Sequence, residues 1–338
     1  MTTFLKETEM ESIASNLDDS NDDERFSSMF HSSITKEACD DLIANDFTII
    51  DNFLGDTRSS MLLKELKELT KTGLMIPNRT SFVNTKTGKP SIIAKPGIYE
   101  VDLHDESIRI TMNMMNKLFI ASKSSLIEAL MKHLGNNMQL ISGDMGRTIK
   151  LQYNIGKGGC FPYHYDNPGV PNNRMLTCIL YLNPSWREGD GGELTLQPFL
   201  DQQISIQPIF DRLVIFKSNS MLHRVQKSFS ERFCCTFWLD GVDTNCIQNT
   251  ELRVNKLAID DIDNTVLMLK KSPKQRSLSR YIYQDEYEES LYDCMEGAAE
   301  GCDEMVASHL FYVKSIEKNP LLRDLVEALR NWRTEHQV

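Results

Sequence analysis

Two histidines and an aspartate are the residues of this chain whose types and spacing could hold a catalytic metal. His164-Tyr165-Asp166 sets an imidazole and a carboxylate two residues apart, and His223 follows further along the chain. Two imidazoles and one carboxylate on one face of a metal leave its other positions open, which is the ligand set of non-haem Fe(II) oxygenases. A His-x-Asp tripeptide alone is weak evidence, because a histidine in strand-rich sequence is often a packed core residue.

The elements that must position these side chains have the pattern of neighbouring strands. Runs of apolar, β-branched and aromatic residues alternate with turn-forming residues, as adjacent strands do. His223 follows a short polar loop, and Arg232 opens the last run. The predicted strands are Thr177–Leu182, Gly189–Leu196, Phe210–Phe216 and Phe233–Leu239. The candidate ligands would therefore sit on strands of a barrel-like sheet, held by rigid elements as a metal site requires.

An ordered set of motifs carries a family resemblance. The matching residues are Tyr153, His164–Pro168, Arg174–Asn183, Trp186, Gly191–Leu194, Phe210–Leu213, Ser218, His223–Val225 and Arg232. On these residues, the segment 149–241 resembles the catalytic core of the 2-oxoglutarate and Fe(II)-dependent dioxygenases. Within them it is most similar to the prolyl hydroxylases of the Egl-nine type, which act on hypoxia-inducible factor. The resemblance implies an α+β fold with a double-stranded β-helix (jelly-roll) core, flanked by N-terminal helices and followed by a helical C-terminal extension.

The resemblance also implies a role for each matching residue of the site. His164, Asp166 and His223 would be the iron ligands. Arg232 would pair with the distal carboxylate of 2-oxoglutarate, because a guanidinium presents a planar fork to a carboxylate whereas a lysine offers a point charge.

Three aromatic positions refine this expectation. Tyr153 and Tyr181 match the tyrosines that line the 2-oxoglutarate pocket, although Tyr181 could equally be a packed strand aromatic. Phe161 stands where the hypoxia-factor enzymes carry a tyrosine, so one hydroxyl near the active site is missing.

The implied activity is hydroxylation of a proline in a protein or peptide substrate, with decarboxylation of 2-oxoglutarate to succinate and CO2. The implied cofactors and cosubstrates are Fe(2+), 2-oxoglutarate, O2 and L-ascorbate. Two alternatives stay open. An oxygenase of the same fold could act on another residue or on a small molecule, because the iron and 2-oxoglutarate residues do not encode the substrate. A catalytically silent binding module is disfavoured, because every ligand position is filled.

Composition and charge narrow the partners. The chain has 338 residues and a net charge of −11, which argues against a nucleic-acid partner because phosphate contact needs a basic face. The acidic balance fits either a basic protein substrate or simply a solvated surface. No run approaches the roughly 18 apolar residues of a membrane span, so we expect a cytoplasmic or nuclear protein without membrane attachment. The eight cysteines show no metal-type spacing and are predicted to be reduced thiols.

Five segments are predicted along the chain. Residues 1–33 are acidic and predicted to be disordered. Residues 34–145 form N-terminal support helices and strands, beginning with a helix capped by Thr35. Within them, the polar stretch 77–97 is either a mobile loop that folds over a peptide or an exposed hairpin. The dioxygenase core spans 146–243, a linker 244–280, and a helical extension 281–338. Helical periodicity does not say whether that extension packs on the core or mediates association.

Overall fold

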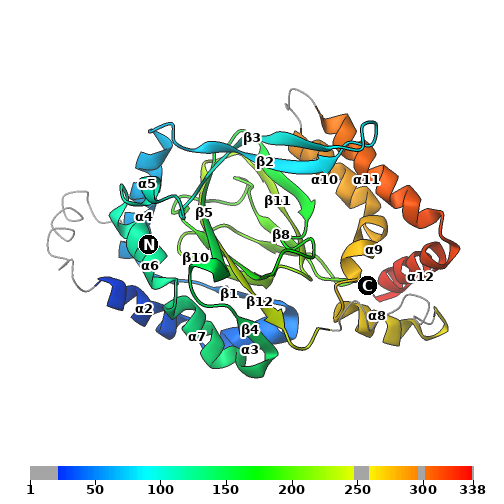
Figure 1. The fold of residues 1–338 in the computed structure, drawn as a ribbon, viewed down its shortest axis with the longest axis horizontal. Helices are drawn as coiled ribbons and strands as arrows, with labels where there is room; N and C mark the ends of the chain where they lie inside the picture. Colours follow the sequence, from blue (N-terminus) through cyan, green and yellow to red (C-terminus); the bar gives the residue numbers. More distant parts are fainter. Residues whose placement is uncertain (1–21, 247–258, 296–300, 337–338) are drawn as a thin grey trace.

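Two antiparallel sheets form the centre of the molecule. The computed structural model describes residues 22–246, 259–295 and 301–336. In these residues an eight-stranded sheet has the order β1-β10-β7-β12-β5-β3-β2, with β4 also paired to β12, and a smaller sheet has the order β6-β11-β8-β9. The strands are β1 Phe47–Ile50, β2 Ile76–Val83, β3 Pro90–Asp102, β4 Met138–Leu140, β5 Arg147–Asn154, β6 Gly159–His164, β7 Arg174–Tyr181, β8 Leu194–Gln197, β9 Ile204–Ile206, β10 Arg212–Lys217, β11 Leu222–Ser228 and β12 Arg232–Asp243. The jelly-roll core expected from the sequence is confirmed, and it lies between two groups of helices (Figure 1).

Side chains between the two sheets form one apolar interior. Ile179 and Tyr181 of β7 pack there against Leu194 of β8 and Val225 of β11. The alternate residues of β7, such as Leu180, point to the other face of the large sheet and pack beneath the N-terminal helices. Because β7 is covered on both faces, its sequence is a continuous apolar run rather than an alternating one.

Six helices from the N-terminal part of the chain cover the outer face of the large sheet. They are α2 Asp22–Ser33, α3 Lys36–Asn45, α4 Asp56–Thr70, α5 Glu106–Arg109, α6 Asn113–Ala121 and α7 Ser125–Leu134. Thr35 caps α3 as expected, its hydroxyl accepting a hydrogen bond from the Ala38 amide at 3.2 Å. The prediction of disorder is wrong for residues 22–33, where Phe26 and Phe30 are fully buried. Composition averaged over the acidic segment hides two aromatic residues one helical turn apart; the earlier residues lie outside the described ranges.

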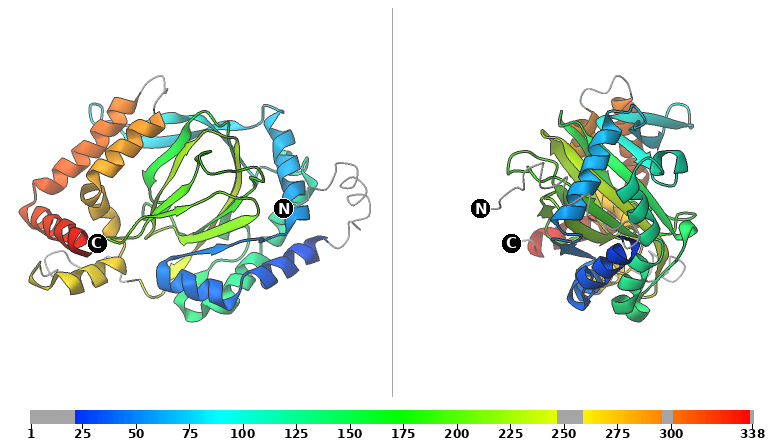
Figure 2. Two further views of the ribbon diagram at one scale, coloured as in Figure 1. Left: turned by 180° about the vertical axis from the view of Figure 1, so that it is seen from behind. Right: turned by 90° about the vertical axis from the view of Figure 1, so that its left-hand side faces the viewer.

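The polar stretch 77–97 forms most of a β-hairpin. β2 and β3 pair from Val83 and Pro90 at the turn back to Ile76 and Glu100. Phe82 and Ile93 pack against residues of the C-terminal helices, so those helices support the far end of the hairpin (Figure 2). The stretch is therefore a hairpin, and its folding over a peptide stays a prediction.

The C-terminal helices pack on the small sheet, which is one of the two arrangements that their periodicity left open. They are α8 Ile262–Lys270, α9 Gln275–Ile282, α10 Gln284–Met295, α11 Cys302–Glu317 and α12 Pro320–His336. Tyr163 of β6 and Leu222 of β11 share a core with these helices. The predicted linker is wrong over residues 262–280, because helices form there and apolar residues such as Leu269 and Leu278 are buried in that core. Residues 247–258 of the predicted linker lie outside the described residues.

A disulfide joins the small sheet to this extension, so the prediction of eight reduced cysteines is wrong. Cys160 of β6 bonds to Cys294 of α10 across a sequence separation of 134 residues. Spacing in the sequence does not reveal which distant cysteines the fold brings together. The bond fastens α10 to the strand that ends at His164.

Asp211 anchors the start of α4 to the turn before β10. Its backbone is left-handed, with φ of 58°. The carboxylate accepts hydrogen bonds from the Leu54 and Gly55 amides at 2.9 and 2.7 Å and from the Ser59 hydroxyl at 2.6 Å. Burial raises the pKa of this carboxyl group, and these three hydrogen bonds oppose that rise. One side chain thus satisfies amides of a helix start that are otherwise unpaired.

We expect Asp211→Ala to lower the free energy of unfolding by about 2–4 kcal/mol, because it strands buried donors and places alanine in a left-handed conformation. Asp211→Asn is the matched control, since asparagine tolerates that conformation and keeps one acceptor oxygen. Urea unfolding should give about half the loss for the asparagine variant. Equal losses for the two variants would contradict this account, because asparagine keeps both one acceptor oxygen and the left-handed conformation.

Candidate active site

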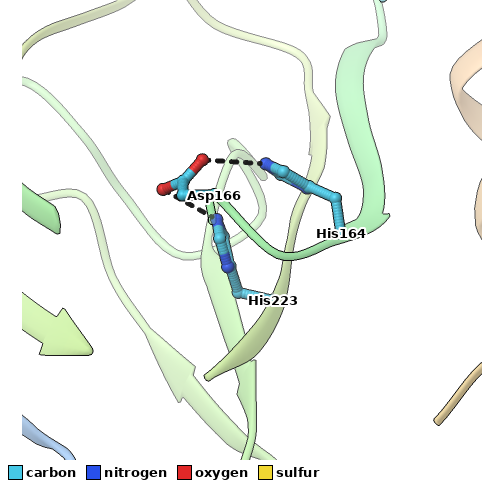
Figure 3. A group of neighbouring side chains, drawn as sticks. All are labelled: His164, Asp166 and His223. Carbon is cyan, nitrogen blue, oxygen red and sulfur yellow. Dashed lines mark ion pairs between the residues drawn. The ribbon is translucent and has the colours of Figure 1, made fainter. Parts of the chain in front are cut away.

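The three predicted metal ligands meet at one end of the small sheet. His164 is the last residue of β6, His223 lies at the start of β11, and the two are direct cross-strand partners. Cross-strand partners point to the same face of a sheet, so both imidazoles face the interior. Asp166 follows β6 and turns its carboxylate toward both rings, with each Nε2 atom 3.6 Å from a carboxylate oxygen (Figure 3). The potential ligand atoms of the three residues all lie within 4.8 Å of one another.

Backbone carbonyls orient the two imidazoles. The Nδ1 atom of His164 lies 2.8 Å from the Pro162 carbonyl oxygen, and that of His223 lies 3.2 Å from the Met221 carbonyl oxygen. We assign the proton of each neutral ring to Nδ1, because only an N–H can donate to a carbonyl. Each Nε2 then keeps its lone pair on the side of Asp166, the arrangement that metal-binding histidines adopt.

A hydroxyl pair holds the carboxylate. Thr177 donates to Asp166 at 2.7 Å and lies 2.8 Å from the Ser218 hydroxyl, from which it accepts. The sequence motifs assign no separate role to Thr177, although a small hydroxyl residue among the apolar residues of β7 is a signal that the sequence contains.

The ionisation states favour metal binding. Burial raises the pKa of Asp166, but His223, His164 and hydrogen bonding outweigh it and hold that pKa well below its usual range. Burial and the neighbouring His164 lower the pKa of His223 to about 4, against the opposing effect of Asp166. At neutral pH the site therefore offers a carboxylate and a neutral His223 imidazole, which fits a divalent iron ion.

Arg232 supplies a buried cation near Tyr181, which shares the apolar interior between the sheets with Phe216, the neighbour of His223. Its side chain donates from Nε to the Gly192 carbonyl oxygen at 3.0 Å and lies 5.0 Å from the ring of Tyr181. Among the described residues, no carboxylate pairs with it. The Tyr181 hydroxyl is buried next to it and has no hydrogen-bond partner in the described part of the chain. A buried guanidinium without an anion and an unpaired hydroxyl fit a bound carboxylate, as 2-oxoglutarate would provide.

The close approach of Arg232 requires a glycine opposite it. Gly192 has φ of +76°, and a Cβ atom there would lie 2.9 Å from both the Arg232 Cδ and the Ser228 Oγ. The second glycine of the Gly191-Gly192 motif is thus explained by the space that the arginine needs.

Tyr153 does not line this pocket, and its predicted role is wrong. It pairs with Phe233 on the outer face of the sheet, stacks on that ring at 4.9 Å between centroids, and donates a short hydrogen bond to Glu231. Burial and Glu231 raise the pKa of Tyr153 to about 12. Gln152 occupies the inner face instead, where it accepts from Cys234 at 3.5 Å.

Strand alternation explains this error. A shift of one residue moves a side chain to the opposite face of a sheet. Ile149 and Leu151 are buried on the face of β5 that also carries Tyr153. Their period of two was the signal that places the tyrosine outside and Gln152 inside.

Comparison with known proteins agrees with this geometry. The family model described as the 2OG-Fe(II) oxygenase superfamily matches residues 150–240. The human prolyl hydroxylase EGLN3 is 30% identical over 199 residues, which cover 57% of this chain and 77% of that protein. The hypoxia-inducible factor prolyl hydroxylase of Caenorhabditis elegans is 27% identical over 255 residues, covering 70% of this chain. The chain spans only about a third of the length of that relative, 34%.

Solved structures extend the likeness to nearly the whole chain. A prolyl 4-hydroxylase from Phytophthora capsici has a TM-score of 0.78 and 38% identity, covering 92% of this chain and 96% of that one. A prolyl hydroxylase from Trichoplax adhaerens, in complex with a hypoxia-inducible factor oxygen degradation domain peptide fragment, has a TM-score of 0.50 and 28% identity. It covers 65% of this chain and 91% of that one.

The chain therefore belongs to the 2OG-Fe(II) oxygenase superfamily, and within it to the prolyl hydroxylases. It is a 2-oxoglutarate-dependent dioxygenase, as its sequence motifs predict. None of the helices in the described ranges is both long and apolar enough to cross a membrane.

Two tyrosine-to-phenylalanine substitutions test whether 2-oxoglutarate contacts the inward-facing Tyr181 or the outward-facing Tyr153. We expect Tyr181→Phe to weaken 2-oxoglutarate binding about 3–10-fold, because it removes one hydrogen bond to a carboxylate. Tyr153→Phe should leave the affinity within about twofold, since its hydroxyl faces the other side of the sheet. Calorimetric titration with Mn(II) in place of Fe(II) measures both constants. A larger effect for Tyr153→Phe would contradict the assignment.

Proposed function

We propose that this chain hydroxylates a proline residue of a protein substrate and converts 2-oxoglutarate to succinate and CO2. The observation that carries the proposal is the combination of His164, Asp166 and His223 around one point with the buried Arg232, which pairs with no carboxylate among the described residues. His164, Asp166 and His223 would hold Fe(II). The metal, when bound, supplies the activation of oxygen that no side chain provides.

The remaining residues orient the reactants and exclude water. Arg232 would bind the distal carboxylate of 2-oxoglutarate, and the Tyr181 hydroxyl would donate to the same group. Thr177 fixes the carboxylate of Asp166, so that this ligand does not rotate away. Phe216 packs against the His223 ring at 4.6 Å between centroids, which keeps that side of the site apolar. Such preorganisation is the protein's share of the catalysis.

A peptide is the substrate class that the surroundings of the site favour. The relative from Trichoplax adhaerens binds a peptide fragment. In this chain, the β2–β3 hairpin carries Lys95 toward Phe161, a neighbour of His164, and the hairpin would form one wall of a groove for an extended segment. L-ascorbate would support repeated turnover and belongs in the assay.

The test combines purified protein with Fe(II), 2-oxoglutarate, ascorbate and a library of proline-containing peptides. We expect succinate release together with addition of one oxygen atom to proline, located by mass spectrometry. His164→Ala, Asp166→Ala and His223→Ala should each reduce both products to background, because each leaves the metal without one of its ligands. His31→Ala, at an exposed histidine of α2, is the control and should remain active.

Each other outcome has a distinct meaning. Coupled turnover by any of the three alanine variants would refute the iron assignment. Oxygen added to another residue type or to a small molecule would refute proline as the target and leave the dioxygenase chemistry intact.

Arg232→Lys tests the proposed cosubstrate anchor. We expect the apparent Michaelis constant for 2-oxoglutarate to rise about tenfold or more, because lysine keeps the charge and loses the two-pronged geometry. Steady-state succinate release measures the constant. Arg187→Lys changes an exposed arginine in the same way and should leave it unaltered. An unchanged constant for Arg232→Lys would mean that another residue anchors 2-oxoglutarate.

A further inference from the structure

Lys95 is a buried lysine beside the active site that none of the roles above explains. Its side chain enters the interior from β3, and the residue is only 8% exposed. The ammonium group lies 4.7 Å from the centroid of the Phe161 ring and donates to the Asn78 side-chain oxygen at 2.5 Å. Lysine is almost never buried to this extent unless its charge is paired, because desolvation of an ammonium costs several kcal/mol.

The polar groups around Lys95 leave its charge unbalanced. The only carboxylate of the described network is that of Glu100, which pairs with Lys150 at 2.5 Å and accepts a further hydrogen bond from Asn78. In the described part of the chain, no carboxylate forms an ion pair with Lys95 itself. The network thus holds two ammonium groups and one carboxylate.

This ammonium faces the site where the substrate must react. The Phe161 ring beneath it lies 6.2 Å from the His164 ring, centroid to centroid. The side chain of His164 is 35% exposed, so the site is open to solvent at this ligand. Burial lowers the pKa of Lys95 to about 8, partly offset by the attraction of Glu100 and Asp166. A divalent metal would neutralise the negative charge of Asp166. Glu100 would then be the only carboxylate of the described network left to offset the positive charges of Lys95 and Lys150.

We propose that Lys95 determines substrate specificity by binding the carboxylate of an acidic residue close to the target proline. This inference rests on the proposed function and names the substrate class of that same site. An acidic side chain supplies the charge that the network lacks, and an ammonium with free N–H groups can donate to it. A purely structural lysine, held by Phe161 and Asn78, is the competing role.

The experiment compares matched peptides that differ in charge and little else. In a library of proline peptides, the residues near proline are Asp and Glu in one set and Asn and Gln in the other. The readout is the ratio of kcat/KM for each acidic peptide to that of its amide partner. We expect a ratio of about 10 or more for the wild type, the size expected for one charge-assisted hydrogen bond in a buried site.

Three variants and a control decide the role of Lys95. Lys95→Met should bring the ratio to within about twofold of one, and Lys95→Gln does the same if the methionine variant fails to fold. Lys95→Arg keeps a cation and should retain a preference for acidic peptides. Lys89→Met removes an exposed lysine next to the turn of the same hairpin and should leave the ratio at the wild-type value.

Two results would overturn the inference. An unchanged ratio in folded Lys95→Met or Lys95→Gln protein would show that Lys95 does not distinguish acidic peptides from their amide partners. Equal activity of the wild type on acidic and amide peptides would show that no such preference exists. Succinate release with the peptide library distinguishes these results from failure of the proposed function, since a wild type that consumes no 2-oxoglutarate with any peptide would refute that function itself.

Discussion

The pairing of β6 with β11 is the constraint on which the site depends. It sets His164 directly opposite His223, so that two residues far apart in sequence present their imidazoles on one face. A register shift of one residue would turn one ring to the outside. Asp166 lies just after the end of β6, and its carboxylate is held by a hydrogen bond from Thr177 of the large sheet. The metal site is therefore a property of both sheets together.

That pairing is held from outside by the C-terminal helices. Next to the inward His164, Tyr163 points outward into the helical core, and next to His223, Arg224 pairs with Asp293 of α10 at 2.9 Å. The disulfide between Cys160 and Cys294 adds a covalent bond at the same interface. Along each of these strands, one residue thus faces the metal site and the next one packs against the C-terminal helices. The extension is part of the scaffold of the active site rather than an appendage.

The sequence was sufficient for features that are written in local patterns. The strands, the Thr35 cap and the metal-binding triad follow from short motifs and from their order along the chain. Features that depend on which face of a strand or helix is buried, or on contacts between distant segments, do not follow from these motifs. The motif alone predicts Tyr153 in the pocket, whereas the alternation of β5 turns this side chain to the outer face. The average composition of the acidic segment does not reveal the two buried aromatic residues that fix α2. The disulfide is not predictable from the spacing of the cysteines, because only the fold brings Cys160 and Cys294 together.

The buried cations of the interior require negative charges, which the bound reactants would supply. A protein interior tolerates a buried cation only when a partner compensates the lost hydration. Arg232 and Lys95 are both buried, and no carboxylate pairs with either among the described residues. The first lies beside the unpaired hydroxyl of Tyr181, and the second beside Phe161 at the open side of the iron site. If 2-oxoglutarate satisfies Arg232, the remaining positive charge must be met by something that arrives from solvent with the substrate. The same physical requirement that identifies the cosubstrate pocket therefore also constrains the chemistry of the peptide.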